Sequence, residues 1–412
     1  MSSPFRLGYL VPEFPRQTHI FFWRECEQLR HRGVEPVFLS TRRPPPAACP
    51  HEFRDRAAAA THYIFPPPAA SVIGMLTRPV GTIRALRYWL GLGGSIKERL
   101  RHLGLLACAA HLASYCRRND VSHVHVHSCG QAALLAAFAQ RLGGLGYSLT
   151  LHNALEDHGP HQRAKWRHAR FAVVVTQRLL AEVKREIGSD LPPTYVASMG
   201  VDLETFRRTT TYQPADPSGP VRIFACGRLH PGKRHDVLIR AVARLRADGI
   251  DARLTIAGED ADSGTGQFRR SLESLIAELG LQDSVRLPGA MSEADVRREL
   301  EASHVFALSS DTEALGIVLV EAMAMSVPVV TTAVGGTTEL VRDGENGLAV
   351  PPGDPPAMAA AIHKIAADPS LAERFSEAGR ATVEAGFGSD RSATTIVAAL
   401  MAHADMPVSS PA

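Results

Sequence analysis

Two carboxylates frame an apolar stretch in SSDTEALGIVLVEAMA, residues 309–324: Glu313 and Glu321, with seven residues between them. The preceding HVFAL, residues 304–308, predicts a buried strand, and the apolar run from Ile317 predicts a helix. Glu313 therefore belongs to the loop at the carboxyl end of a strand, where open parallel sheets bind ligands. A carboxylate in that position can accept hydrogen bonds from two neighbouring hydroxyls of a sugar or a ribose.

The predicted start of this helix adds groups of opposite polarity. The first N–H groups of a helix have no partner within it, so the backbone at Leu315, Gly316, Ile317 and Val318 favours a bound anion. A structural alternative is that one acid only starts the helix and the other lies on the surface. This segment alone fits both interpretations.

A second segment, CGRLHPGKRHDVLIRA, places Arg228 and Lys233 in another loop after a predicted strand. Two cations beside helix N-termini suit a diphosphate. Gly335 and Gly336 form a further turn between a strand and a helix, where a backbone without side chains allows close approach. Together the two segments describe a site for a nucleoside diphosphate that carries a polar group.

The same loop also fits a different nucleotide motif. Residues 227–233 match G-x-x-x-x-G-K, the beginning of a phosphate-binding P-loop. Arg234 follows in place of the Ser or Thr that binds magnesium, and Arg228, His230 and Pro231 are bulky for a loop that wraps phosphate. We therefore disfavour the P-loop.

Three other patterns have both a functional and a structural interpretation. His123, His125 and His127 alternate along one strand; they fit a zinc site, but we favour packing, with His127 as a further candidate at the strand end. Asp260 and Asp262 form a D-x-D pair, which we interpret as turn chemistry. Residues 76–102 carry cations and aromatic side chains that suit an anionic membrane, although a solvated helix fits equally. The residues of this membrane or acceptor face are Arg84, Arg87, Trp89, Lys97 and Arg101.

The elements that position these residues alternate between short apolar strands and amphipathic helices, which predicts α/β architecture with parallel sheets. The alternation runs to about residue 206, breaks at the Pro-rich residues 207–220, and restarts at 221. We expect two doubly wound, Rossmann-like domains facing a central cleft, over 1–206 and 221–385, with 207–220 as linker. Residues 386–412 are expected to form a C-terminal helix, packing back on the N-terminal domain, and a tail.

Composition excludes several classes of protein. The 412 residues include 45 basic and 42 acidic side chains, for a net charge of +3, which argues against a nucleic-acid binder. The six cysteines contain no CxxC pair, so neither a zinc site nor a disulfide framework is implied. The N-terminus lacks the pattern of a signal peptide, and no apolar run is long enough to span a membrane. We expect a cytoplasmic protein.

The three motifs CGRLHPGKRHDVLIRA, SMGVDLETFRR and TEALGIVLVEAMAMSVPVVTTAVGGTTELVRDGENGLAVPPGD together resemble the retaining GT-B glycosyltransferases of family 4. The E-x7-E motif of that family matches Glu313 and Glu321. The N-terminal segment PEFPRQTHIFFWRE departs from the Gly-Gly loop common in the family and is similar to the branch that builds exopolysaccharide. In this loop we expect contacts from Arg16, Gln17 and Thr18.

The resemblance implies a role for each matching residue. Glu313 would contact the transferred sugar, Glu321 the ribose, and Arg228 with Lys233 the diphosphate. His152, in SLTLHN, would lie beside the sugar. No metal or other cofactor is implied, because the two cations stand where other transferases use a metal.

The expected activity is transfer of a sugar, with retention of configuration, from a UDP- or GDP-sugar to a glycan or lipid-linked acceptor in bacterial polysaccharide or glycoconjugate synthesis. The N-terminal domain would bind the acceptor and the C-terminal domain the donor, at the inner face of the cell membrane. Two alternatives are a nucleotide-sugar epimerase of the same fold and a P-loop-type nucleotide-binding protein.

Overall fold

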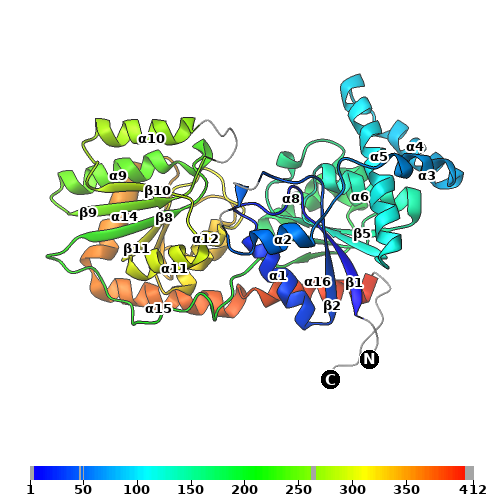
Figure 1. Ribbon diagram of the computed structural model, residues 1–412. Helices are drawn as coiled ribbons and strands as arrows, with labels where there is room; N and C mark the ends of the chain where they lie inside the picture. Colours follow the sequence, from blue (N-terminus) through cyan, green and yellow to red (C-terminus); the bar gives the residue numbers. More distant parts are fainter. Residues whose placement is uncertain (1–3, 46–47, 50, 261–265, 404–412) are drawn as a thin grey trace. The chain divides into compact units, whose positions relative to one another are not determined.

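The computed structural model describes residues 4–45, 48–49, 51–260 and 266–403, which form two compact units (Figure 1). Unit 1 comprises the described residues up to Ser198 together with those from Asp390 onward, and unit 2 comprises Met199–Ser389. Each unit contains one sheet whose strands are all parallel. The predicted α/β architecture of two Rossmann-like domains is thereby confirmed.

Unit 1 is built on a sheet of seven strands in the order β3-β2-β1-β4-β5-β6-β7. The strands are β1 (Phe5–Leu10), β2 (Val34–Ser40), β3 (His62–Tyr63), β4 (His123–Val126), β5 (Gly146–Leu151), β6 (Ala172–Val174) and β7 (Thr194–Val196). The α-helices are α1 (Ile20–His31), α2 (Arg54–Ala60), α3 (Ala69–Leu76), α4 (Pro79–Leu92), α5 (Ile96–Arg118), α6 (Gln131–Gly143), α7 (Gln162–Trp166), α8 (Gln177–Ile187) and α16 (Asp390–His403). Short 3-10 turns, η2 (Leu155–His158) and η3 (Gly188–Asp190), follow β5 and α8.

The C-terminal helix α16 belongs to the core of unit 1. Its buried side chains Ile396 and Leu400 pack in one apolar cluster with Leu7 and Phe22. Arg32, directly after α1, donates a hydrogen bond to Thr394, and Tyr195 of β7 contacts His403 at 2.7 Å. The last helix of the chain thus covers a face of the sheet that the first strand begins.

Unit 2 is built on six strands in the order β10-β9-β8-β11-β12-β13. The strands are β8 (Val221–Cys226), β9 (Ala252–Ala257), β10 (Val285–Gly289), β11 (Val305–Leu308), β12 (Val329–Thr332) and β13 (Leu348–Val350). The α-helices are α9 (His235–Ala247), α10 (Gln267–Glu278), α11 (Glu293–Ala302), α12 (Ile317–Ala324), α13 (Thr337–Leu340), α14 (Pro355–Ala367) and α15 (Pro369–Gly386), and a 3-10 turn, η4 (Pro231–Lys233), precedes α9.

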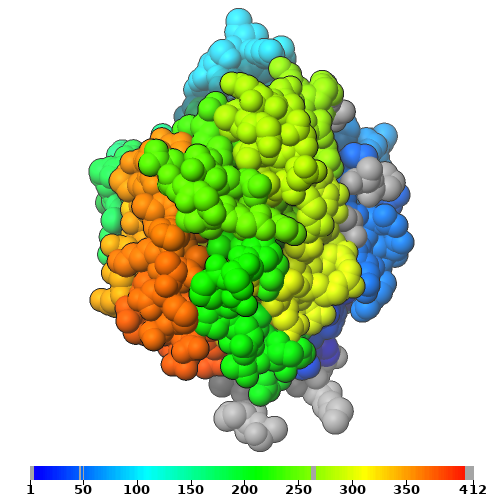
Figure 2. All heavy atoms as spheres, turned by 90° about the vertical axis from the view of Figure 1, so that its left-hand side faces the viewer, coloured from blue at the N-terminus to red at the C-terminus, as the bar shows by residue number. Residues whose placement is uncertain are grey.

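The neighbouring strands β11 and β12 of unit 2 are buried along their whole length, as expected for a parallel sheet between layers of helices. Along β8, Ile223 and Ala225 pack in the cluster that contains the buried side chains of α9, α10 and α14, whereas Phe224 packs in the cluster of α11 and α12. Figure 2 shows the outer face of this unit, with α9 and α10 in green to yellow-green and α14 and α15 in orange. Successive side chains of a strand therefore pack against opposite layers of helices.

Residues 207–220, expected to be a linker, pack against unit 2. Tyr212 and Ala215 are buried in its core, and the Tyr212 hydroxyl donates to the carbonyl oxygen of His304 at 2.8 Å. Thr209 and Thr210 donate through their N–H groups to Glu301. The chain passes from unit 1 to unit 2 after Ser198 and returns after Ser389.

Candidate functional site

In unit 2, the loops after β8 and β11 meet where the strand order reverses, because these two strands are neighbours in the sheet. Ligands of doubly wound sheets bind at this switch point. The Asp311 N–H donates to the carbonyl oxygen of Gly232 at 2.9 Å, and the Ser309 hydroxyl lies within hydrogen-bonding distance of the carbonyl oxygens of Lys233 and Arg234. The backbone therefore holds the two predicted ligand-binding loops together.

Lys233 and Glu313, predicted separately for a diphosphate and a sugar, form a direct ion pair between Nζ and Oε2. Both side chains are largely buried, with exposed fractions of 19% and 14%. The Ser310 hydroxyl donates to the same carboxylate oxygen at 3.3 Å. The two charges neutralise each other at the carboxyl end of the sheet. A ligand that brings an anionic group for Lys233 and polar groups for Glu313 can replace this contact.

The backbone of Glu313 is fixed by the predicted double-glycine turn. The Gly336 N–H donates to the carbonyl oxygen of Glu313 at 2.9 Å. Gly335 has a φ of +54°, and a Cβ atom at this position would overlap that carbonyl group. The close backbone approach that the two glycines predict is therefore an approach to Glu313.

Arg228 has an exposed side chain, for which the described residues provide no hydrogen bond or ion pair. Its backbone, by contrast, is anchored, since His235 Nε2 lies 3.1 Å from the Arg228 carbonyl oxygen. Burial lowers the pKa of His235 to about 4, so the neutral imidazole donates through Nε2–H. His235 is a positioning residue that sequence reasoning missed, because its only signal was its place at the start of a helix.

Glu321 lies in the second turn of α12 with an exposed fraction of 7%, which excludes the interpretation of a surface acid. Gly316 precedes the helix with a φ of +82°, a conformation that favours glycine. The first turn of α12 consists of Ile317 and Val318, half-buried, and the buried Leu319. The structure thus places the acid in the helix that begins directly after the Glu313 loop.

The loop 227–233 does not have the geometry of a P-loop, in which successive N–H groups must be free for phosphate. The N–H groups of Gly227 and Leu229 pair with the neighbouring strand end, at the carbonyl oxygens of Ala257 and Glu259. The Gly232 N–H donates to Nδ1 of His230, and the Lys233 N–H to the His230 carbonyl oxygen. The backbone N–H groups that a P-loop would offer to phosphate therefore already have partners within the protein.

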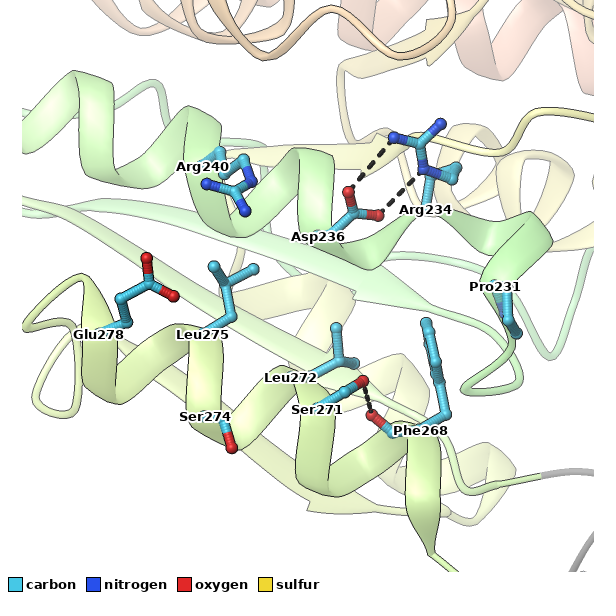
Figure 3. Close-up of a pocket in the computed structure, with 10 residues that line it drawn as sticks. All are labelled: Pro231, Arg234, Asp236, Arg240, Phe268, Ser271, Leu272, Ser274, Leu275 and Glu278. Carbon is cyan, nitrogen blue, oxygen red and sulfur yellow. Dashed lines mark hydrogen bonds and ion pairs between the residues drawn. The ribbon is translucent and has the colours of Figure 1, made fainter.

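Arg234 has a φ of +48° and precedes the first residue of α9. Its guanidinium bridges Asp236 and Asp311, both at 3.1 Å, and these ion pairs offset the cost of the left-handed backbone. Figure 3 shows Arg234 and Asp236 at one end of a groove of about 400 Å³ between α9 and α10. Neither Lys233 nor Glu313 lines this groove, so it is separate from the candidate donor site.

In unit 1, His152 follows β5 and contacts a chain of buried polar groups. His152 Nε2 lies 3.2 Å from His127 Nδ1, His127 Nε2 lies 3.3 Å from Glu25 Oε2, and the Tyr9 hydroxyl donates to that oxygen at 2.6 Å. The chain joins the carboxyl ends of β4 and β5 to helix α1. Among the described residues, His152 Nδ1 is buried without a hydrogen-bond partner.

The electrostatics of this chain favour neutral imidazoles. Burial lowers the pKa of His152 to about 3 and lowers that of His127 well below its usual value, while burial raises the pKa of Glu25. Among the described residues, His127 Nε2 makes no hydrogen bond, although Glu25 Oε2 lies 3.3 Å from it. Sequence reasoning found His127 and His152 but missed Glu25, which looks like any polar residue of an amphipathic helix.

The segment after β1 is held by backbone contacts. The Gln17 N–H donates to the carbonyl oxygen of Ala48 at 2.7 Å, and Arg16 pairs with Glu13 at 3.0 Å. Thr18 is exposed. These three residues lie at the carboxyl end of β1, beside the switch point between β1 and β4.

The other two predicted polar patterns pack within the fold. His123 and His125 bond to the hydroxyl of Ser148, and His125 also to that of Thr150, at 2.7–2.8 Å. Asp260 accepts the N–H groups of Phe268 and Arg269 at the start of α10. Asp262 lies outside the described residues.

Comparison with known proteins agrees with this geometry. A family model described as Glycosyl transferases group 1 matches residues 207–382. The chain is 30% identical over 279 residues to alpha-D-kanosaminyltransferase of Streptomyces kanamyceticus, covering 62% of this chain and 70% of the relative. It is 28% identical over 257 residues to the putative colanic acid biosynthesis glycosyltransferase WcaL of Salmonella typhimurium, covering 59% and 61%.

Among solved structures, the chain is similar to HepE of Anabaena in complex with UDP and glucose, with a TM-score of 0.74 and 18% identity over 97% of this chain and 99% of that one. At this identity the likeness concerns the fold alone. That fold is the GT-B architecture predicted from the sequence.

Proposed function

The chain belongs to the family Glycosyl transferases group 1, and we propose on that basis that it is a retaining, metal-independent enzyme that transfers a sugar from a UDP- or GDP-sugar to a glycan or lipid-linked acceptor. The observation that carries the proposal is the ion pair of Lys233 and Glu313 at the switch point of unit 2, with the exposed cation of Arg228 on the same loop. A nucleoside-diphosphate sugar contains both groups that these side chains need, an anionic diphosphate and a hydroxylated ring.

On donor binding, the diphosphate attracts Lys233 and Arg228, and the carboxylate of Glu313 then accepts hydrogen bonds from sugar hydroxyls. Glu321, in the following helix, accepts the hydroxyls of the ribose. Donor binding thus replaces the ion pair of Lys233 and Glu313 by several charge-assisted contacts with the donor. Neither charged side chain is left without a partner. Leu315, Gly316, Ile317 and Val318 supply backbone groups near the phosphates.

The bond between the anomeric carbon and the diphosphate oxygen breaks as the acceptor hydroxyl attacks from the same face of the sugar. The departing diphosphate takes the proton of that hydroxyl, so retention needs no protein nucleophile. Lys233 and Arg228 stabilise the charge that develops on the leaving group. We also propose His152 of unit 1 as a contact of the sugar, with a neutral imidazole because burial lowers its pKa to about 3.

We assign the donor to unit 2 and the acceptor to unit 1, with Arg16, Gln17 and Thr18 as contacts of the bound substrates. We propose UDP as the nucleotide to test first, since HepE, which has the same fold, was crystallised with UDP and glucose. The similarity to WcaL supports a role in polysaccharide synthesis. We further propose that the enzyme is held peripherally at the inner face of the cell membrane.

The first experiment measures thermal stability of the purified protein with UDP, GDP, ADP, ATP and GTP, each with magnesium or with chelator. A diphosphate at about 100 times its dissociation constant adds about 2.7 kcal/mol to the free energy of unfolding. We expect one diphosphate to raise the melting temperature equally with chelator. A shift confined to a triphosphate with magnesium contradicts the proposal.

The second experiment uses the donor sugar of that nucleotide. Glu313→Ala should abolish sugar transfer and leave the thermal shift by the diphosphate intact, whereas Glu321→Ala should reduce that shift. Glu345→Ala, an exposed acid of the same unit, is the matched control. Full activity of Glu313→Ala would refute its assignment, and a donor changed without any acceptor would identify an epimerase.

A further inference from the structure

Exposed apolar side chains gather on three consecutive helices of unit 1. Of the twelve large hydrophobic side chains that are exposed among the described residues, ten lie on α3, α4 and the first turns of α5. They are Val72, Ile73, Leu76, Val80, Ile83, Leu86, Leu90, Ile96, Leu100 and Leu103. We call this set the apolar face. In Figure 1 the three helices project from the edge of their own sheet.

Helix α4 is apolar on two opposite sides. One side carries Ala85 and Leu92, both buried, and Tyr88, whose ring meets Phe138 of α6 edge-on at 5.3 Å. The other side carries Val80, Ile83 and Leu90 at helical spacing, each more than half exposed. The first side satisfies the packing of unit 1, so the exposed side is not needed for the core.

The first turns of α5 repeat the arrangement. Ile96, Leu100 and Leu103 follow one another at spacings of four and three residues and are exposed, while His102 and Leu106 are buried. Ile96 is 80% exposed, close to a free side chain. A contiguous patch of this kind is rare on soluble proteins and marks an interaction surface.

The charged side chains around the apolar face are almost all positive. Residues 69–103 contain six cations, Arg78, Arg84, Arg87, Lys97, Arg99 and Arg101, and a single acid, Glu98. Glu98 is engaged in a capping box with Ser95 at the start of α5. Arg84, Arg87, Lys97 and Arg101 are exposed, as required for the predicted basic face.

Trp89, also predicted for this face, connects two helices. Its ring is only partly exposed, its Nε1–H donates to the carbonyl oxygen of Arg99 at 3.1 Å, and the Arg99 guanidinium lies 5.9 Å from the ring centroid. Trp89 and Arg99 thus tie α4 to the first turns of α5. The two exposed stripes therefore belong to one connected helical segment.

We propose that the apolar face docks on an anionic lipid bilayer, with its apolar side chains among the acyl chains and its cations at the lipid phosphates. Apolar stripes with interspersed cations are the composition of helices that lie in a membrane interface. No helix in the described parts of the chain is long and apolar enough to span a membrane. The proposal specifies the surface for the peripheral location proposed above, and its test needs no sugar transfer.

The test is sedimentation of the full chain with vesicles of phosphatidylcholine alone or mixed with phosphatidylglycerol, without nucleotide. We expect partition into the anionic vesicles only, weakening as salt is added. Ile96→Ser with Leu100→Ser should lower the partition coefficient about 100-fold, from the loss of two inserted side chains. Arg84→Gln with Arg87→Gln should lower the partition coefficient roughly 30-fold, because each lost cation weakens binding by about tenfold or less.

The matched control is Lys184→Gln with Arg185→Gln, which removes the same charge from exposed positions on α8. This variant should bind vesicles almost as tightly as the unchanged protein. Equal losses in both charge variants would mean unspecific attraction and overturn the proposal. A different result would also overturn the proposal. The unchanged protein would bind no vesicles and would form a dimer in solution that Ile96→Ser with Leu100→Ser dissociates. A second copy of the chain would then cover the apolar face.

Discussion

At the scale of single residues, the candidate site of unit 2 is built on an ion pair. Lys233 and Glu313 neutralise each other within a largely buried environment. Desolvation makes an unpaired charge costly in such places, so each partner also keeps the other in position. A ligand that replaces one partner must bring its own complementary charge, which is a source of selectivity.

The pair of Glu25 and His127 should affect the reaction through His152. His152→Ala should lower kcat roughly 100-fold, as for loss of one preorganised group at a transition state, with KM for the donor nearly unchanged. Glu25→Gln should lower kcat less, because Glu25 acts on His152 only indirectly, through its contact with His127 at 3.3 Å. Steady-state kinetics with the donor and acceptor provide the measurement.

Glu27→Gln is the control for this prediction, since Glu27 is exposed on the same helix. It should retain full activity. If Glu25→Gln matches it, the buried chain has only a structural role.

The sequence was informative for residues whose chemistry depends on local spacing. Glu313 and Lys233 could be predicted because each follows a strand directly, and parallel strands bring their carboxyl ends to one edge. Glu25 and His235 could not, because their partners are distant in sequence or are backbone atoms. Such contacts arise from the packing of whole elements, and residue types along one helix do not report them.

At the scale of elements, the turns after β8, β11 and β12 act as one support for Glu313. Gly335→Ala should displace the carbonyl group of Glu313, because the new Cβ overlaps it and the φ of +54° disfavours alanine. We expect a loss of about 1–3 kcal/mol in unfolding free energy and loss of most sugar transfer. Denaturant unfolding and an activity assay measure the two effects.

Gly344→Ala separates backbone strain from this overlap. Gly344 has a φ of +75°, but a Cβ there meets no atom within 4 Å. The variant should lose some stability and keep its activity. Equal activity losses in both variants would show that the contact with Glu313 is irrelevant.

Strand β4 should make the stability of unit 1 depend on pH. Burial lowers the pKa of His123 to about 3 and that of His125 well below 6.5, and His127 and His152 shift in the same direction. Below pH 6.5 the unfolded chain binds protons that the folded chain does not, so stability falls as the pH falls from 6.5 toward 3. Each such histidine contributes a slope of about 1.4 kcal/mol per pH unit. The raised pKa of Glu25 acts in the opposite direction but involves one group.

Urea unfolding at pH 7.5, 6 and 5 measures this slope, and His125→Gln should reduce it by about 1.4 kcal/mol per pH unit. His31→Gln, at an exposed position, is the control. An unchanged slope for His125→Gln would mean that His125 is protonated in the folded chain.

At the scale of the whole molecule, the boundary between the two units depends on which segments pack together and less on where the sequence is rich in proline. The Pro-rich residues 207–220 look like a linker in sequence, yet Tyr212 and Ala215 are buried in unit 2. The repeated alternation of strands and helices sufficed to predict two parallel sheets, because each half must bury its own strands. The first crossing point, after Ser198, could not be predicted, since it depends on which tertiary contacts each segment makes.

The last helix provides a direct measure of this organisation. Leu400 of α16 is fully buried in the cluster that includes Leu7 and Phe22, whereas the neighbouring Met401 is 36% exposed. All three tryptophans, Trp23, Trp89 and Trp166, belong to unit 1, so their fluorescence reports its unfolding. Leu400→Ala should therefore lower the unfolding free energy followed by tryptophan fluorescence by about 2–5 kcal/mol.

Met401→Ala should change that free energy far less, because an exposed side chain loses little buried area. Since Leu400 stands almost 400 residues after Leu7, a large effect of Leu400→Ala would show that the N-terminal sheet depends on the end of the chain. Equal small effects of both substitutions would mean that unit 1 is stable without the packing of α16. In that case the chain's return to unit 1 after Ser389 would contribute little to its stability.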